Sequence, residues 1–266
     1  MPAELDPLLA RYQLAQQIAV KAGQLTLRYF RDGEFEVERK LDGSPVTVAD
    51  RSAEELLRRH ITEQFADDRI VGEEWPEKAG SSGYCWVLDP IDGTHSFVSG
   101  VPLYSTLIGI TCAGVPQVGV INIPALHEMV HAATGHGAWY LRGDHPPCPA
   151  RVSDTRQLSE GLFCTSEVKT FTQRQRLHVY QRLEERSRLT RTWGDGYGYL
   201  LVATGRAELM VDPELQVWDA AALQPVLQEA GGTFTDWEGR ATIESGEGIA
   251  TNGHVLDEVL AITRGQ

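Results

Sequence analysis

The chain has 266 residues, enough to bury a large core, and its 42% apolar and 23% charged content is ordinary for a globular protein. Its formal net charge of −13 argues against a nucleic-acid partner, because the phosphate backbone attracts a basic surface. No apolar run approaches the ~18–20 residues of a membrane span, and the first residues lack the features of a secretory signal.

The first quarter of the chain predicts two helices and three short extended segments. Apolar residues recur at three- and four-residue steps from Leu8 to Phe30, which is typical of an amphipathic helix. Asp50 is expected to cap a second helix that runs to about Phe65, with Glu54 placed to complete a capping box. The extended segments are 36–40, 46–49 and 69–72, and a turn at 42–45 separates the first two.

The rest of the chain alternates strands with helices. Strands are expected at 84–88, 103–112, 117–123, 129–134, 137–141, 162–166, 207–211, 233–236 and 248–251. Helices are expected at 172–187, in a segment ending with 200–205, at 218–230 and at 255–263. Three prolines fall within 144–149, so we predict a crossing there between an N-terminal half, 1–146, and a C-terminal half, 147–266.

A turn follows the apolar run 84–88. That run is long enough for a buried strand and too short for a helix, and it stops at Asp89. Pro90 removes a backbone donor and Gly93 is a permissive turn residue. One interpretation is an ordinary tight turn in which Asp89 caps its own backbone.

The second interpretation of this turn is a metal site. The turn can aim the carboxylates of Asp89 and Asp92 and the carbonyl of Ile91 at one point. Three hard oxygen donors suit Mg²⁺, which prefers oxygen ligands. Thr94 follows and either donates its hydroxyl or caps a helix whose free N–H groups attract a phosphate.

Acidic residues also stand at the ends of several other predicted elements. They are Glu73, Glu74, Asp212, Glu214 and Asp219. Taken singly, such an acid more often caps a helix or faces solvent than takes part in chemistry. As a set they favour a site, because Asp219 begins a helix of small residues that allows close approach to another element.

These motifs resemble the inositol monophosphatase-like family of magnesium-dependent phosphatases. In the family's order they are Gly72-Glu73-Glu74, Asp89-Pro90-Ile91-Asp92-Gly93-Thr94 and Trp218-Asp219-Ala220-Ala221. The stretch 46–50 resembles the family's upstream Thr-x-x-Asp element. The resemblance covers nearly the whole chain. It implies an α/β fold in which helix and sheet layers alternate in two closely packed halves, and it implies a homodimer.

The resemblance also implies two or three Mg²⁺ ions, for which Mn²⁺ is a possible substitute. Glu73, Asp89 and the Ile91 carbonyl would hold the first ion. Asp89, Asp92 and Asp219 would hold the second. Glu73 would also help to hold a third, looser ion through water.

The remaining roles concern the phosphate and the attacking water. Gly93 and Thr94 would offer N–H groups to the phosphate. Asp50 and Thr94 would position or deprotonate the water, with Glu73 assisting and Lys40 as a possible charge partner. Because phosphoryl transfer depends mainly on positioning and charge stabilisation, no cysteine or serine nucleophile is needed. We therefore expect hydrolysis by a metal-activated water.

The substrate expectation depends on three further segments. The stretches 94–108, 193–199 and 212–219 are most similar to the branch of the family that hydrolyses histidinol phosphate. That substrate carries an ammonium and an imidazole, with which acids beyond the metal ligands can pair. The expected substrate-binding residues are Asp92, His95, Ser96, Asp195 and Asp212. The alternative is that Asp195 and Asp212 are ordinary loop or cap acids.

Other functions stay open. Inositol 1-monophosphate or another sugar phosphate would use the same metal ligands. A non-catalytic interaction protein is disfavoured because the acids are complete and no basic patch is visible. The twelve-residue loop of a calcium-binding module is absent from the sequence. The four cysteines form no Cys-x-x-Cys pair, which favours reduced thiols and a cytoplasmic location, and histidine biosynthesis is a plausible setting.

Overall fold

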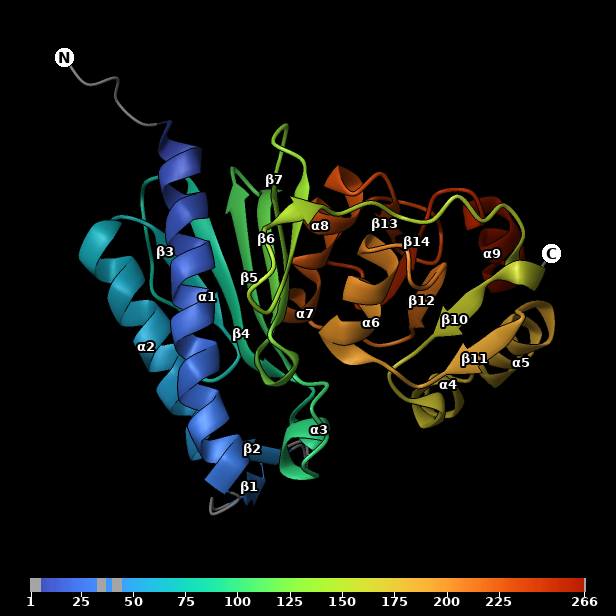
Figure 1. Cartoon of the computed structure of the whole chain (residues 1–266), viewed down its shortest axis with the longest axis horizontal. Helices are drawn as coiled ribbons and strands as arrows, with labels where there is room; N and C mark the ends of the chain where they lie inside the picture. The colour runs from blue at the N-terminus through green and yellow to red at the C-terminus, as the bar shows by residue number, and fades with distance from the viewer. Residues whose placement is uncertain (1–5, 33–36, 40–44, 266) are drawn as a thin grey trace.

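Two long N-terminal helices cover one face of a large sheet. The computed structural model describes residues 6–32, 37–39 and 45–265 (Figure 1). Helix α1 (Pro7–Asp32) and helix α2 (Val48–Gln64) bury apolar residues that recur at three- and four-residue steps, so each presents one apolar stripe to the core. These residues are Tyr12, Ala15, Ile18, Ala19 and Ala22 in α1, and Ala53, Leu57 and Ile61 in α2. Both predicted helices are confirmed.

The first sheet has seven strands, and their order in space follows the chain. They are β3 (Arg69–Gly72), β4 (Tyr84–Asp92), β5 (Ser105–Cys112), β6 (Val115–Ile123), β7 (Glu128–Ala133), β8 (Ala138–Arg142) and β9 (Cys148–Pro149). Strands β3 and β4 are parallel, and the other neighbours are antiparallel. A small pair, β1 (Val37–Arg39) and β2 (Pro45–Thr47), precedes α2. Three short helices complete the connections: α3 (Thr94–Val98), η1 (Pro124–Leu126) and η2 (Leu158–Glu160).

The second sheet has five strands in the order β11-β10-β12-β14-β13. They are β10 (Leu162–Cys164), β11 (Leu189–Arg191), β12 (Leu209–Asp212), β13 (Thr233–Thr235) and β14 (Gly248–Thr251). One face is covered by α4 (Val168–Gln173), α5 (Leu177–Arg186) and α9 (Leu256–Thr263). Helices α6 (Asp195–Ala203), α7 (Val217–Ala220) and α8 (Leu223–Glu229) lie between the two sheets (Figure 1). The predicted alternation of helix and sheet layers is confirmed.

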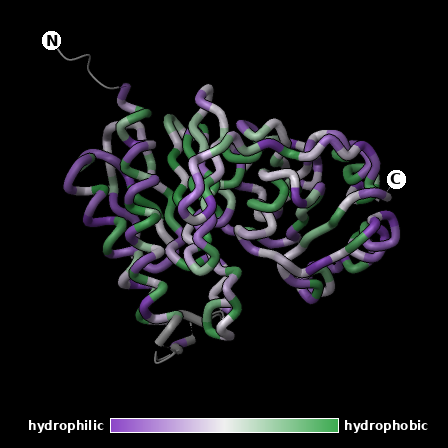
Figure 2. Tube along the Cα trace, in the orientation of Figure 1, coloured by the Kyte–Doolittle hydropathy of each residue, from purple (hydrophilic) through white to green (hydrophobic). Residues whose placement is uncertain are grey.

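One apolar core lies between the two sheets. It contains Leu107 and Ile121 from the first sheet, Leu200 from α6 and Met210 from the second sheet, all buried. In Figure 2 the hydrophobic colour follows the strands and the layer between them, and the hydrophilic colour gathers on outer helices and turns. The two parts of the chain are therefore closely packed, while the division at residues 146 and 147 stays a prediction. Across the described ranges, no helix combines the length and apolarity that a membrane crossing requires.

The start of α2 differs from the prediction. The N-cap is Thr47, whose hydroxyl accepts from the backbone N–H of Ala49, and Asp50 occupies the third helical position. The Asp50 carboxylate completes the capping box by accepting from the Thr47 N–H at 2.8 Å. Glu54 is therefore not part of the box, and its carboxylate accepts from the segment that follows β3.

Two predicted helices are each divided in two. The expected helix 172–187 is interrupted between α4 and α5, where Gln175 has a left-handed φ of 57°. The expected helix 218–230 is divided into α7 and α8, because Pro225 has no N–H and its ring would clash with the carbonyl of Ala221 in a continuous helix. Strand β11, which follows α5, is an element that the sequence did not predict.

Candidate active site

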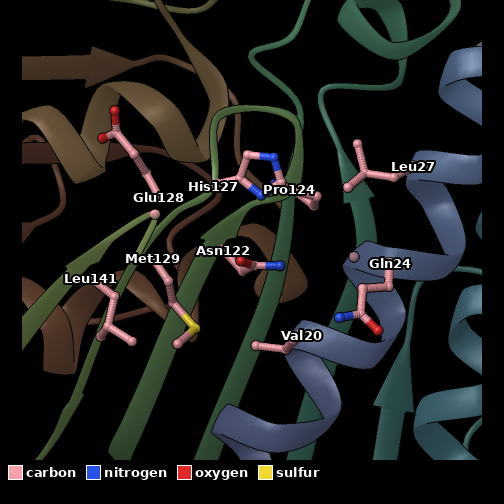
Figure 3. A pocket seen from close by; sticks show the side chains of 11 residues that line it. Val20, Gln24, Leu27, Asn122, Pro124, His127, Glu128, Met129 and Leu141 are labelled. Carbon is pink, nitrogen blue, oxygen red and sulfur yellow. The ribbon is translucent and has the colours of Figure 1, made fainter. Parts of the chain in front are cut away.

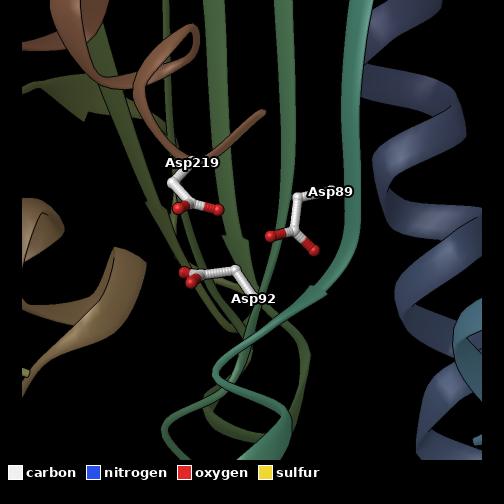
Figure 4. A group of neighbouring side chains, drawn as sticks. All are labelled: Asp89, Asp92 and Asp219. Atoms are coloured by element: carbon white, nitrogen blue, oxygen red, sulfur yellow. The ribbon is translucent and has the colours of Figure 1, made fainter. Parts of the chain in front are cut away.

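Three aspartates from two elements converge beside the first sheet. Asp89 and Asp92 belong to β4, and Asp219 belongs to α7 (Figure 4). Each offers a carboxylate oxygen, and these oxygens lie within 4.8 Å of one another. This is a spacing at which one divalent cation can contact all three side chains.

An irregularity in β4 brings two of these acids together. The strand continues to Asp92, beyond the expected end at Asp89, and its register against β5 shifts between these two residues. Pro90 lies inside this irregularity, where the missing N–H interrupts no regular ladder. The carboxylate of Asp89 accepts from the N–H of Ile91 at 3.1 Å. The expected local cap on Asp89 and the expected convergence of Asp89 with Asp92 are thus present together.

Neighbouring elements fix the orientations of Asp92 and Asp219. Oxygen Oδ2 of Asp92 accepts from the hydroxyl of Ser105 at 2.6 Å and from the N–H of Gly196 at 2.5 Å. Oxygen Oδ2 of Asp219 accepts from the N–H of Gln216 at 2.7 Å, as part of a capping box at the start of α7. A strand of the first sheet, helix α6 and the N-cap of α7 therefore hold these carboxylates in place.

The three acids form a region of strongly unfavourable negative charge. Burial, followed by the charges of Glu73, Asp92 and Asp219, raises the pKa of Asp89 well above its usual value. Burial raises the pKa of Asp92 to about 6. Burial and the charge of Asp92 raise the pKa of Asp219 to about 8. Because the charged neighbours that act on these groups are themselves acids, a bound cation would relieve both the repulsion and the loss of hydration.

A hollow of about 380 Å³ surrounds this cluster. Its lining consists of Glu73, Asp89, Ile91, Asp92, Gly93, Thr94, Gln216, Trp218 and Asp219. The hydroxyl of Thr94 donates to the carbonyl of Ile91 at 3.1 Å, and Gly93 is the N-cap of α3. The structure therefore places every predicted metal ligand, and both predicted phosphate ligands, around one hollow.

Asp50 has one carboxylate oxygen that is satisfied and one that is not. Oxygen Oδ2 accepts from the N–H and the hydroxyl of Thr47, whereas Oδ1 is buried and has no hydrogen-bond partner among the described residues. Burial raises the pKa of Asp50, and the nearby charge of Glu73 contributes. A buried oxygen without a partner is costly unless water or a ligand satisfies it.

A second, smaller hollow adjoins the first. It shares Asp92 and Asp219 with the larger hollow, and it is also lined by Ser166, Asp195 and Glu214. Asp195 begins α6 with a left-handed φ of 53°, which is uncommon for a residue other than glycine. Backbone strain of this kind concentrates at functional sites. The structure thus brings the predicted residue Asp195 beside the acid cluster.

Gly93 makes the close approach of Asp195 possible. Its φ is 81°, and a Cβ at this position would lie 2.5 Å from the Oδ2 atom of Asp195. A side chain on residue 93 would therefore displace Asp195 and also strain the backbone.

Asp212 lines the smaller hollow, but its carboxylate is already hydrogen-bonded within the protein. It is 2% exposed, and its carboxylate accepts from the hydroxyl and N–H of Ser166 and from the hydroxyls of Thr165 and Tyr199. The hydroxyl of Ser166 in turn accepts from the N–H of Asp195 at 2.9 Å. The structure accordingly favours a supporting position for Asp212, behind Ser166.

The structure does not place three further predicted residues in these hollows. His95 is exposed and Ser96 is half-buried, and neither lines the hollow around the acid cluster or the smaller one beside it. Lys40 lies outside the described residues. Their roles stay predictions.

A more apolar hollow lies between α1 and strands β6 to β8 (Figure 3). Its lining includes Val20, Leu27 and Met129, and none of the predicted site acids. Two of its polar residues are paired within the protein: Asn122 donates to the carbonyl of Ala19, and Glu128 accepts from Tyr140 and Arg206. Because Glu128 is the one acid that the described residues contribute to its lining and is already paired, this hollow offers less metal-binding chemistry than the one around Asp89.

Several residues of the site were not identified from the sequence. Ser105 and Gly196 hold Asp92, Ser166 contacts the start of α6, and Gln216 holds Asp219. A local signal existed for Ser105, because two hydroxyl residues, Ser105 and Thr106, begin a strand that is mostly apolar beyond them. Gly196 and Ser166 reach their partners across 104 and 29 positions of the chain, whereas Gln216 lies three residues before Asp219, in a capping box that could have been recognised locally.

Comparison with known proteins gives consistent results. A model of the inositol monophosphatase family matches residues 9–266. The histidinol-phosphatase of Chlorobaculum parvum is 42% identical over 256 residues, which are 96% of this chain and 97% of the relative. The fructose-1,6-bisphosphatase/inositol-1-monophosphatase of Thermotoga maritima is 33% identical over 219 residues, which are 82% and 81% of the two chains. A solved IMPase structure from Thermotoga maritima superposes with a TM-score of 0.84 at 30% identity, covering 96% of this chain and 97% of that chain.

Proposed function

The chain belongs to the inositol monophosphatase family, and from this premise we propose that it hydrolyses L-histidinol phosphate to L-histidinol and phosphate. Membership of this family, together with relatives named histidinol-phosphatase, makes the chain a phosphoric monoester hydrolase. The observation that carries the proposal is the convergence of Asp89, Asp92 and Asp219 in a hollow that continues to Asp195.

The acid cluster fits a divalent cation. Three carboxylates with mutually close oxygens, surrounded by other acids, form a hard-oxygen ligand set of the kind that Mg²⁺ prefers. We propose Mg²⁺ as the natural ion, held by Asp89, Asp92 and Asp219, with Glu73 and the Ile91 carbonyl completing two or three ion sites. Mn²⁺ prefers similar ligands and would substitute.

Bound divalent cations neutralise the charge of a phosphate ester and lower the pKa of a water molecule beside it. The chain's own residues would bind and orient the reactants. The N–H groups of Gly93 and Thr94 would bind the phosphate oxygens at the edge of the hollow. The unpartnered Oδ1 of Asp50 would accept a hydrogen bond from the attacking water and take its proton.

The substrate proposal depends on the second hollow. Histidinol phosphate brings a cationic ammonium group, and Asp195 presents a carboxylate in a hollow whose other charged residues are Asp92, Asp212, Glu214 and Asp219. A charge-assisted hydrogen bond between the ammonium and Asp195 would contribute about 1.5–3 kcal/mol. Relatives named histidinol-phosphatase, at 36–42% identity, support this choice.

A second candidate is an inositol or sugar phosphate. The Thermotoga maritima relative, whose name gives both a fructose bisphosphatase and an inositol monophosphatase, supports it. Such substrates offer hydroxyl groups and no cation. They would therefore use the same metal ligands without requiring the charge of Asp195.

The test is a phosphate-release assay with Mg²⁺ on histidinol phosphate, inositol 1-phosphate and fructose 1,6-bisphosphate. We expect the highest kcat/KM with histidinol phosphate. Asp195→Asn keeps the size of the side chain and removes its charge, so kcat/KM for histidinol phosphate should fall about 10- to 100-fold. The kcat/KM values for inositol 1-phosphate and fructose 1,6-bisphosphate, which carry no ammonium group, should fall much less. A preference of the wild type for inositol 1-phosphate would refute the substrate proposal.

The other implied properties accompany this proposal. We propose a cytoplasmic homodimer that acts in histidine biosynthesis, and a non-catalytic interaction role is disfavoured because the site retains its complete set of acids. Size-exclusion chromatography with light scattering would test the dimer.

A further inference from the structure

We propose that Glu54 and Arg58, on α2, are positioning residues that set the place of Glu73 in the metal site. The inference rests on the proposed function, because Glu73 is a proposed metal ligand. Neither Glu54 nor Arg58 lines the hollow around Asp89, so both would act through Glu73.

Glu54 binds the backbone directly after Glu73. Its carboxylate is fully buried, and Oε2 accepts from the N–H of Glu74 at 2.8 Å. Oxygen Oε1 accepts from the N–H of Trp75 at 3.3 Å and from Nε of Arg58 at 2.7 Å. One side chain on α2 therefore holds two successive amides of the segment that carries Glu73.

Arg58 holds the carbonyl groups of the same segment. Its Nη2 donates to the carbonyl of Trp75 at 2.9 Å, and its Nη1 donates to the carbonyl of Pro76 at 3.0 Å. With Glu54 it forms an ion pair one turn apart on α2, at 2.7 Å. The pair thus fixes both donors and acceptors of residues 74–76, which limits the freedom of this segment to move relative to α2.

Gly72 allows Glu54 to approach from the other side. A Cβ on this residue would lie 2.1 Å from Oε1 and 2.5 Å from Cδ of Glu54, so any side chain here would displace the Glu54 carboxylate. The Glu54 carboxylate therefore packs against the residue before Glu73 and binds the residue after it. The backbone of Glu73 itself donates to the carbonyl of Leu88 in β4, at 3.3 Å.

This arrangement connects two parts of the proposed site through one helix. Asp50 and Glu54 are four residues apart on α2, so they lie on the same face of the helix. Asp50 is the proposed acceptor of the water proton, and Glu54 holds the segment of Glu73. The helix would thereby fix the distance between the attacking water and one metal ligand.

A purely structural role explains the pair less well. A buried ion pair contributes little net stability, and apolar residues of similar size often replace one without loss. Here the pair is used to orient three backbone residues beside proposed ligands. Partners that orient metal ligands typically change metal affinity or activity 10- to 100-fold when they are removed.

The test is the dissociation constant for Mn²⁺ in the purified protein, measured from the free Mn²⁺ signal by electron paramagnetic resonance. The variants are Glu54→Gln and Arg58→Met, with melting temperatures recorded for each. Arg69→Met is the matched control, because Arg69 pairs with Glu77 at 2.6 Å and, within the described part of the chain, its side chain donates no hydrogen bond to residues 74–76. Asp89→Asn serves as the reference for loss of the site itself.

We expect Glu54→Gln and Arg58→Met to weaken Mn²⁺ binding by about 10-fold or more, with Arg69→Met unchanged. The Mg²⁺ concentration for half-maximal phosphate release should rise by a similar factor, and the activity lost at low Mg²⁺ should be largely recovered at high Mg²⁺. Unchanged dissociation constants, a lower melting temperature alone, or equal weakening in Arg69→Met would overturn the inference. Unchanged Mn²⁺ binding in Asp89→Asn would overturn the proposed metal site instead, and with it this inference.

Discussion

Replacing Asp219 with asparagine should stabilise the metal-free protein. Burial and the charge of Asp92 raise the pKa of Asp219 from 3.8 to about 8 in the folded state. A carboxyl group with a raised folded pKa binds protons more tightly in the folded state, so it destabilises the fold at pH values above its unfolded pKa. At about 1.4 kcal/mol per pKa unit, the interval from pH 3.8 to pH 7 corresponds to a cost of about 4 kcal/mol.

Asparagine removes this cost and keeps the local geometry. Its Oδ1 atom can still accept from the N–H of Gln216, as Oδ2 of Asp219 does. Its NH₂ group would then face the carboxylates of Asp89 and Asp92, which are hydrogen-bond acceptors. We therefore expect a gain of up to about 4 kcal/mol in the free energy of unfolding at pH 7 without metal.

Urea unfolding in EDTA, followed at several pH values, measures this gain. The difference between Asp219→Asn and the wild type should grow as the pH rises from 4 to 8. It should vanish near pH 4, where the wild-type carboxyl is protonated in the folded state and becomes so in the unfolded state. Adding Mg²⁺ should stabilise the wild type and have little effect on the variant. A variant less stable than the wild type in EDTA at pH 7, or equally stabilised by Mg²⁺, would refute this reasoning.

Three further predictions follow from particular contacts. Gly93→Ala places a Cβ 2.5 Å from the Oδ2 of Asp195 at a φ of 81°, so the free energy of unfolding, measured in urea, should fall by about 1–3 kcal/mol. In phosphate-release assays, kcat/KM should fall more for histidinol phosphate than for phosphate esters without an ammonium group. Asp50→Asn should lower kcat about 100-fold or more with little change in Mg²⁺ affinity, which calorimetric titration measures. Weakened Mg²⁺ binding with an unchanged kcat would contradict the role of Asp50 as proton acceptor. Arg11→Met leaves the buried carboxylate of Asp68 without its 2.7 Å partner, so urea unfolding should show a loss of about 3–5 kcal/mol; a loss below 1 kcal/mol would contradict the importance of this pair.

Much of the fold could be predicted because periodicity reflects burial on one face. The stripe of α1 and the short apolar runs of the first sheet are local patterns, and each is present in the structure. The break between α4 and α5 depends on a left-handed Gln175, which has no sequence signal. The break between α7 and α8 did have one, because Pro225 cannot follow Ala221 in an unbroken helix.

The site was predictable where one motif carries both the turn and its acids. Asp89 and Asp92 lie three residues apart, so a local irregularity in β4 is enough to bring them together. Groups that hold the site residues in place come from distant parts of the chain. The N–H of Gly196 donates to Asp92 across 104 positions, and the carboxylate of Glu54 accepts from the N–H of Glu74 across 20. Such contacts depend on how the layers pack, which no local pattern of residue types specifies.

The convergence of the acids on a divalent cation is tested most directly by anomalous diffraction from crystals soaked in Mn²⁺. We predict a strong peak bounded by the carboxylates of Asp89, Asp92 and Asp219, and its loss in crystals of Asp89→Asn. A peak elsewhere in the molecule, or none between these three side chains in the wild type, would contradict the account.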